Sequence, residues 1–138
     1  MLQTCDKLFV YGTLMSAFVN SMSGRLNAGN RLLGPASLNG HLYDLNGYPG
    51  VIHDPCSETR IHGELYEIFE AEETLLWLDR YEVASPEFNL MNEYQRILIP
   101  VNFRDQKINA WMYHYIKSTK NLIRIPSGNY LEYVTCKM

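Results

Sequence analysis

The chain has 138 residues, 46% of them hydrophobic, and a formal net charge of −3, which is the composition of an ordinary globular protein. That length predicts one domain over residues 1–138, and the acidic balance argues against nucleic acid as a partner, because no basic stripe would neutralise phosphates. No apolar run approaches the roughly 20 residues that span a bilayer, and the short polar start does not resemble a signal peptide. We therefore expect no contact with a membrane and a cytoplasmic location.

The first predicted element is a strand that stops at a glycine. An apolar run begins at Lys7 and ends in Tyr11-Gly12-Thr13-Leu14. A strand that ends at glycine can leave backbone N–H groups unpaired, and these can hold an anion or a developing oxyanion. A plain turn would give the same pattern. A short helix is predicted between Ser16 and Leu26, with Gly24 making its end irregular.

Four later segments alternate apolar and polar residues as half-buried strands do. They are Arg31–Leu45, Arg60–Ile68, Tyr94–Phe103 and Lys107–Tyr115. The last two are separated by Arg104-Asp105-Gln106, a short polar connection that suits an antiparallel hairpin. Asn39-Gly40 inside the first segment indicates a turn or a bulge, and Tyr48-Pro49-Gly50-Val51 has the residues of a Pro-Gly turn.

The clearest helix is predicted over Glu70–Tyr81. Its first turn is acidic, which the helix dipole favours, and Leu75, Leu78 and Tyr81, with Leu76 alongside, fall on one apolar face. These elements together predict an α+β fold, with a small mixed or antiparallel barrel-like sheet flanked by helices.

Glu82 is the strongest candidate for chemistry, because it directly follows the predicted helix. The helix dipole disfavours a carboxylate there, and apolar neighbours such as Trp77 would raise its pKa toward that of a general base. A solvated surface glutamate is the alternative on the residues alone. Asp79, three residues earlier, shares the face of Glu82 and could either assist it or form a salt bridge.

Cysteines and histidines do not form a metal-binding or catalytic pattern. Cys5, Cys56 and Cys136 are far apart and predict free thiols, and the four histidines form no short-range ligand pair. We therefore expect no metal and no cofactor.

Taken in order, several short motifs resemble the γ-glutamylcyclotransferase-like family. The motifs are Tyr11-Gly12-Thr13-Leu14, Tyr48-Pro49-Gly50-Val51, Gly63-Glu64-Leu65-Tyr66 and Leu78-Asp79-Arg80-Tyr81-Glu82. Members of this family, which includes γ-glutamylamine cyclotransferases and bacterial types, cyclise γ-glutamyl groups to 5-oxoproline. The resemblance implies the same activity on a small γ-glutamyl substrate, with Glu82 as catalytic acid and base.

The resemblance also implies a substrate-binding set around Glu82. Its members are Tyr11, Gly12, Thr13, Leu14, Tyr48, Pro49, Gly50 and Arg96. Arg96 could pair with a substrate carboxylate or equally with a neighbouring one. The segment Val83–Glu93 is longer than in many relatives, so the leaving group is left open. Oligomeric state is left open too. A binding module or an interaction domain of the same fold is the alternative to an enzyme.

Overall fold

The computed structural model describes residues 6–12, 15, 21–45, 48–81 and 94–136. Its elements, in chain order, are β1 Lys7–Val10, α1 Ser21–Gly29, β2 Arg31–Asp44, β3 Pro49–His53, β4 Arg60–Glu67, α2 Ala71–Tyr81, β5 Tyr94–Phe103, β6 Gln106–Tyr115, β7 Ile123–Arg124 and α3 Tyr130–Cys136. No helix in these ranges is long and apolar enough to cross a membrane.

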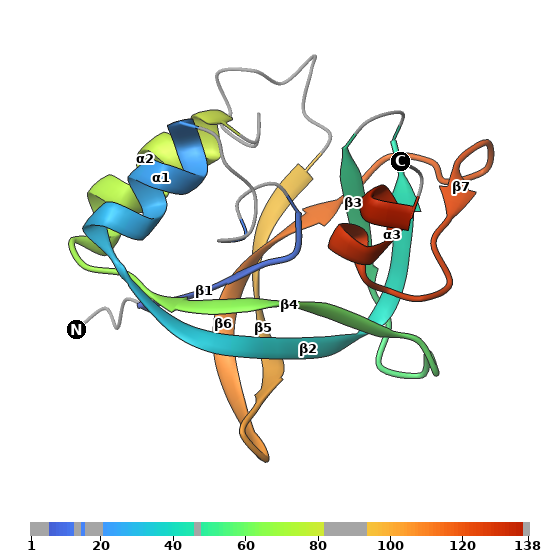
Figure 1. Ribbon diagram of the computed structural model, residues 1–138, viewed down its shortest axis with the longest axis horizontal. Helices are drawn as coiled ribbons and strands as arrows, with labels where there is room; N and C mark the ends of the chain where they lie inside the picture. The colour runs from blue at the N-terminus through green and yellow to red at the C-terminus, as the bar shows by residue number, and fades with distance from the viewer. Residues whose placement is uncertain (1–5, 13–14, 16–20, 46–47, 82–93, 137–138) are drawn as a thin grey trace.

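Five of the described strands close into a barrel (Figure 1). They pair in the order β2, β4, β1, β6 and β5, and a pairing of Ser37 with Asn102 joins β5 back to β2. The β1–β6 pair is parallel and the other pairs are antiparallel. The predicted α+β fold with a mixed barrel-like sheet is therefore confirmed.

The strand β2 is long enough to belong to two sheets. Its first part pairs with β4 in the barrel, and its last residues, Gly40–Asp44, pair with β3. The short β7 also pairs with β2 at Tyr43 and Asp44. Figure 1 shows β3, β7 and α3 together on one side of the barrel, and α1 and α2 on the other.

Two apolar clusters hold the fold together. Inside the barrel, Phe9, Leu38 and Leu65 are almost completely buried. Between the barrel wall and the two long helices, Leu8 and Val10 pack in a cluster that includes Leu26 of α1 and the α2 residues Leu75 and Leu78. Because β1 is buried on both faces, its sequence is a continuous apolar run without the alternation of a half-exposed strand.

Three predicted details are wrong. Pro49 and Gly50 open the strand β3 and do not form a loop, since the first residue of a strand tolerates a missing N–H. Asn39-Gly40 does not interrupt β2, and the irregularity falls between Leu32 and Gly34. Leu76 is 54% exposed, on the solvent side of α2.

The ends of two helices also differ from the prediction. α1 extends to Gly29, and the predicted start, residues 16–20, lies outside the described residues. α3, which the sequence did not predict, begins at Tyr130. The segment Val83–Glu93 also lies outside the described residues.

Candidate active site

Most of the described residues predicted to bind substrate meet at one end of the barrel. Tyr11 and Gly12 follow β1, and Pro49 begins β3. These two segments touch, because a Cβ added to Gly12 would lie 2.6 Å from Cγ of Pro49. The hydroxyl of Tyr94, at the start of β5, donates a hydrogen bond to the carbonyl of Pro49 at 2.6 Å. Glycine at position 12 therefore permits a contact that a side chain would prevent.

A backbone hydrogen bond joins Met15 to Gly12. The N–H of Met15 donates to the carbonyl of Gly12 at 2.9 Å, and the Met15 side chain is buried in the helix-side cluster. Thr13 and Leu14, which lie between them in sequence, are outside the described residues. The structure thus fixes both ends of the predicted loop.

The other predicted segment, Tyr48–Gly50, is held by β2 and β6. The N–H of Leu45 donates to the carbonyl of Tyr48 at 2.7 Å, and the Tyr48 side chain is 40% exposed. A Cβ on Gly50 would lie 2.6 Å from Cδ1 of Leu45 and 3.1 Å from Tyr115. Gly50 therefore lets β3 approach the end of β6 closely.

A chain of hydrogen bonds ties the loop after β1 to the end of α2. The hydroxyl of Tyr11 donates to the carbonyl of Tyr113 at 2.6 Å, and the hydroxyl of Tyr113 donates to Oδ1 of Asp79 at 2.6 Å. Arg96 completes the chain, donating from Nε to Oδ1 of Asp79 at 2.8 Å and from Nη2 to Oδ2 at 3.2 Å. These contacts join β1, β5, β6 and the last turn of α2.

Arg96 forms the structural ion pair that the sequence left open as one of two possibilities. Its guanidinium is bidentate with Asp79 and lies 4.4 Å from the ring centroid of Trp111. Bidentate pairing fixes the orientation of both side chains, which a single contact would not do. A direct contact between Arg96 and substrate stays a prediction.

Of the two candidate carboxylates, Asp79 is described by the structure and has hydrogen-bond partners. Both carboxylate oxygens of Asp79 accept hydrogen bonds, three in all, from Arg96 and Tyr113. Glu82 is the residue directly after α2 and lies outside the described residues. The turn of α2 that precedes Glu82 is therefore fastened to the barrel by Asp79.

Sequence reasoning missed Tyr113 and Tyr115 at this end of the barrel. Tyr113 and Tyr115 lie on β6 opposite Arg96 and Tyr94 of β5, and the rings of Tyr94 and Tyr115 meet edge to face, 6.0 Å apart. The period-two spacing of Tyr113 and Tyr115 was a signal that they share a face. Their partners depend on the register of β5 and β6, which the sequence leaves open.

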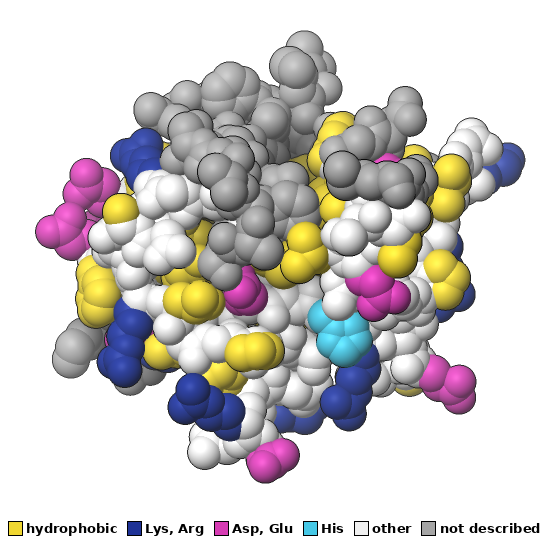
Figure 2. Space-filling model, in the orientation of Figure 1, with side chains coloured by type: hydrophobic (Ala, Val, Ile, Leu, Met, Phe, Trp, Pro, Cys, Tyr) yellow, Lys and Arg dark blue, Asp and Glu magenta, His cyan; other side chains and the backbone are white. Residues whose placement is uncertain are grey.

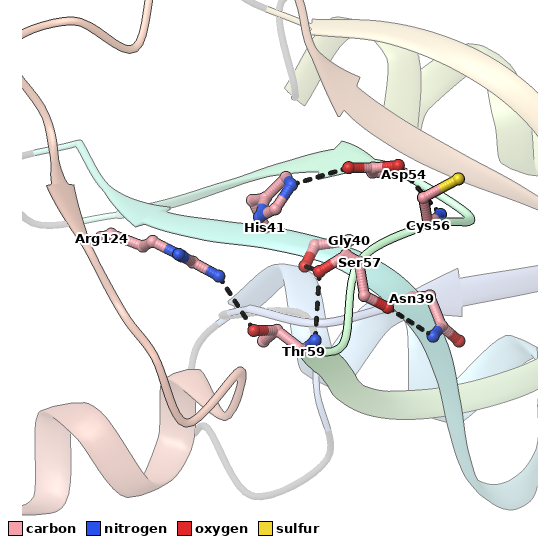
Figure 3. A network of polar contacts seen from close by, with 8 residues as sticks. All are labelled: Asn39, Gly40, His41, Asp54, Cys56, Ser57, Thr59 and Arg124. Carbon is pink, nitrogen blue, oxygen red and sulfur yellow. Dashed lines mark hydrogen bonds and ion pairs between the residues drawn. The ribbon is translucent and has the colours of Figure 1, made fainter.

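A second polar network fixes the connection between β3 and β4 (Figure 3). Ser57 donates through Oγ to the carbonyl of Gly40 at 2.8 Å, and Asn39 donates through Nδ2 to the carbonyl of Ser57 at 2.8 Å. Nε2 of His41 lies 2.9 Å from Oδ2 of Asp54. This hydrogen bond is the largest cause of a lowered pKa of the Asp54 carboxyl, and a hydrogen bond from the Cys56 N–H lowers that pKa further. These polar groups of the β3–β4 connection and of β2 form hydrogen bonds with one another, so we assign this network a structural role.

Other features of the described residues do not add to the site. Cys56 and Cys136 are free thiols, as predicted, and the structure shows that both are exposed. Cys5 is outside the described residues. No three His, Cys, Asp or Glu side chains group as a metal ion would need, within the part of the chain that the structure describes. Two hollows lined by described residues, one beside the β5–β6 turn and one between α1 and α2, contain none of the predicted site residues.

Comparison with known proteins gives matches over nearly the whole chain. A family model described as gamma-glutamyl cyclotransferase, AIG2-like, matches residues 8–132. The solved structure of the protein ytfP from Escherichia coli is 32% identical, with a TM-score of 0.64, over 93% of this chain and 98% of that one. No curated protein matches the chain significantly.

Two further solved structures have the same fold. The YkqA protein of Bacillus subtilis is 25% identical, with a TM-score of 0.71, over 96% of this chain. This chain spans 42% of the length of that protein. An AIG2-like protein of Mus musculus has a TM-score of 0.68 at 20% identity, over 91% of this chain and 87% of that one, a likeness that shows the fold alone.

Proposed function

Because this chain belongs to the gamma-glutamyl cyclotransferase, AIG2-like family, we propose that it cyclises a γ-glutamyl group to 5-oxoproline and releases an amine or amino acid. The proposed catalytic residue is Glu82. The proposed substrate-binding surface is the end of the barrel where Tyr11, Gly12 and Pro49 meet.

The substrate of such a reaction carries its own nucleophile. The α-amine attacks the γ-carbonyl carbon, a new C–N bond closes the five-membered ring, and the C–N bond to the leaving amine breaks. At neutral pH the amine is largely protonated, since α-amino groups titrate near pH ~8. The Glu82 carboxylate takes a proton from the attacking amine and returns one to the leaving amine, so one residue serves both steps.

The hydrogen-bond chain from Tyr11 to Arg96 is the observation that carries this proposal. It connects Tyr11, directly after β1, with the last turn of α2, which is the turn that precedes Glu82 in the sequence. Asp79 has both oxygens engaged, which favours Glu82 over Asp79 as the base. General acid–base catalysis needs this positioning before it needs a tuned pKa.

The second requirement of the reaction is a folded glutamyl chain, which the loop Tyr11–Leu14 would hold. Backbone N–H groups after Gly12 would steady the tetrahedral oxyanion, and the Pro49 segment would form a wall of the pocket. Because Gly12 has no Cβ, the Pro49 segment can lie directly against this loop.

The proposal is tested by measuring 5-oxoproline release from a panel of γ-glutamyl amines and γ-glutamyl dipeptides. We expect the wild type to release 5-oxoproline from at least one member of the panel, which also identifies the leaving group. Glu82→Gln should lower turnover by roughly 10²–10⁴-fold, the usual loss for an acid–base residue. Its melting temperature should stay close to that of the wild type.

Glu72→Gln is the matched control, because it makes the same change on exposed Glu72 in the first turn of α2. It should keep wild-type turnover. Equal activity of wild type and Glu82→Gln would show that Glu82 is not the base. No release by the wild type from any substrate, together with a raised melting temperature in 5-oxoproline, would contradict the enzyme and favour a binding module.

A further inference from the structure

A polar groove lies beside the turn between β5 and β6. It has a volume of about 570 Å³, within the range of roughly 300–1,000 Å³ of small-molecule sites. Its lining residues come from the barrel strands β2, β4, β5 and β6 and from the turn at Arg104 and Asp105. Tyr94 and Tyr115 mark the other end of the β5–β6 hairpin, so this groove is separate from the candidate active site.

The floor of the groove is a straight row of polar side chains that crosses the seam of the barrel. His62 pairs with Ser37, Ser37 pairs with Asn102, and Asn102 pairs with Lys107. Directly paired residues point to the same face of a sheet, about 4.5–5.5 Å apart. The neighbours of this row along the strands, such as Ala36 and Val101, are buried inside the barrel, so the row points outward.

Two arginines flank this row. Arg60 lies two residues before His62 and therefore on the same face of β4. The start of β4 is held against the segment that contains Gly128. The N–H of His62 donates to the carbonyl of Gly128 at 2.8 Å, and a Cβ on Gly128 would collide with the carbonyl of Arg60. The Arg60 side chain therefore projects into the groove from a rigid backbone.

Arg104 occupies the turn under backbone strain. Arg104 and Asp105 have φ of 47° and 63°, in the left-handed region where two-residue hairpin turns prefer Asn-Gly. Its guanidinium lies 4.9 Å from the ring centroid of Phe103 and donates through Nη2 to the carbonyl of Leu33 at 3.3 Å. An arginine has five N–H donors, so these contacts orient the group and leave donors available to a ligand.

The groove is positive in a chain that is negative overall. It carries Arg60, Arg104 and Lys107 against the single carboxylate of Asp105, whereas the whole chain has a net charge of −3. No ion pair joins these three cations to a carboxylate within the described ranges. Figure 2 shows Lys and Arg side chains gathered around this end of the hairpin, at the bottom of the view.

We propose that this groove binds a small molecule that carries adjacent negative charges, a phosphorylated or polycarboxylate metabolite. The row of donors would meet its oxygen atoms, and the arginines would pair with phosphate or carboxylate groups in bidentate fashion. The field of the cations would draw such an anion to this end of an otherwise acidic protein.

The experiment is an NMR titration of the full ¹⁵N-labelled chain with pyrophosphate and, separately, with citrate. We expect saturable shifts confined to the amides of the groove, such as Ser37, Asn102 and Lys107, that persist in about 0.15 M salt, where the Debye length is about 8 Å. Saturation by pyrophosphate alone identifies a phosphate ligand, and saturation by citrate alone identifies a carboxylate ligand. No localised saturable shift with either anion would overturn the proposal.

Two double variants separate a specific site from general electrostatics. Arg60→Gln with Lys107→Gln should weaken binding roughly tenfold or more, since hydrogen bonds to charged groups carry at least this factor. Lys117→Gln with Lys120→Gln removes the same charge from two exposed lysines beyond the other end of β6, and should bind as the wild type does. Equal weakening in both variants would overturn the proposal. Melting temperatures check that both double variants fold. If the variant with Arg60→Gln and Lys107→Gln does not fold, the single variant Arg104→Gln takes its place.

Discussion

Asp79 shows how one side chain can join a helix to a barrel. Its carboxylate accepts two hydrogen bonds from Arg96 and one from Tyr113, and these residues face each other on β5 and β6. Both charged side chains are only partly exposed, at 20% for Asp79 and 24% for Arg96. Removing one partner of such a pair leaves the other without compensation, so its loss costs more than the loss of a surface pair.

We predict that Asp79→Asn lowers the free energy of unfolding by roughly 1–3 kcal/mol, the cost of leaving a partly buried charged group with weakened hydrogen bonds. The measurement is urea denaturation of Asp79→Asn, Arg96→Gln and the double variant. The double variant should lose less than the sum of the two single variants, because both remove the same interaction. Strictly additive losses would show that the ion pair contributes no coupling energy.

Among the elements, the strand β1 has barrel neighbours on both edges and apolar clusters on both faces. It pairs with β4 on one side and with β6 on the other, and both of its faces are buried. Gly63 of β4 allows β1 to lie this close to β4. A Cβ at Gly63 would collide with the carbonyl of Val10 and would lie 2.7 Å from Cζ of Phe9.

We predict that Gly63→Ala destabilises the protein by about 1–3 kcal/mol or more, since overpacking against backbone forces the two strands apart. Gly24→Ala is the matched control, because a Cβ at Gly24 on α1 meets no atom within 4 Å. That substitution should stabilise the protein by roughly 0.5–1 kcal/mol through helix propensity. Thermal denaturation of both variants measures the difference, and equal melting temperatures would contradict this account of Gly63.

Elements were predictable where a pattern was regular. α2 was recognised from its acidic first turn and from Leu75 and Leu78, which are buried. β3 was not recognised, since Pro49-Gly50 has the composition of a turn and becomes a strand only because β2 continues past Gly40 to pair with it. Local propensity predicts a turn there, and tertiary pairing overrides it.

At the scale of the whole molecule, acid should unfold the protein partly through His114. Burial, followed by the charge of His53, lowers the pKa of the His114 imidazole, and a hydrogen bond with the backbone of Tyr115 opposes this only partly. The unfolded chain therefore binds a proton at His114 more readily than the folded protein does. Stability from the neutral imidazole is fully present above the unfolded pKa of about 6.5 and is lost as pH falls through the lower, folded pKa.

We predict that His114→Gln reduces the decline in the free energy of unfolding as the pH falls below about 6.5. Urea denaturation of wild type and variant at a series of pH values measures this slope. The comparison at about pH 8, where the imidazole is neutral in both states, reports the packing cost of the substitution alone. Identical slopes in wild type and variant would contradict a depressed pKa at His114.

The barrel also separates the two regions to which we assign binding. The candidate active site lies where β5 begins and β6 ends, and the basic groove lies at the turn that joins them. Six residues of β5 separate Arg96 of the site from Asn102 of the groove, which at about 3.3 Å per residue is a distance of roughly 20 Å. A ligand in one region would not touch a ligand in the other.

The alternating strands, the amphipathic helix and the family motifs could be predicted from the sequence, because periodicity and short motifs are local properties. The sequence also named Tyr11, Gly12, Pro49 and Arg96, which the structure gathers at one end of the barrel. The partner of each of these residues could not be predicted in this way. Asp79 and Arg96 are 17 residues apart and Tyr11 and Tyr113 are 102 apart, so their contacts depend on strand register and barrel closure, which no local pattern encodes.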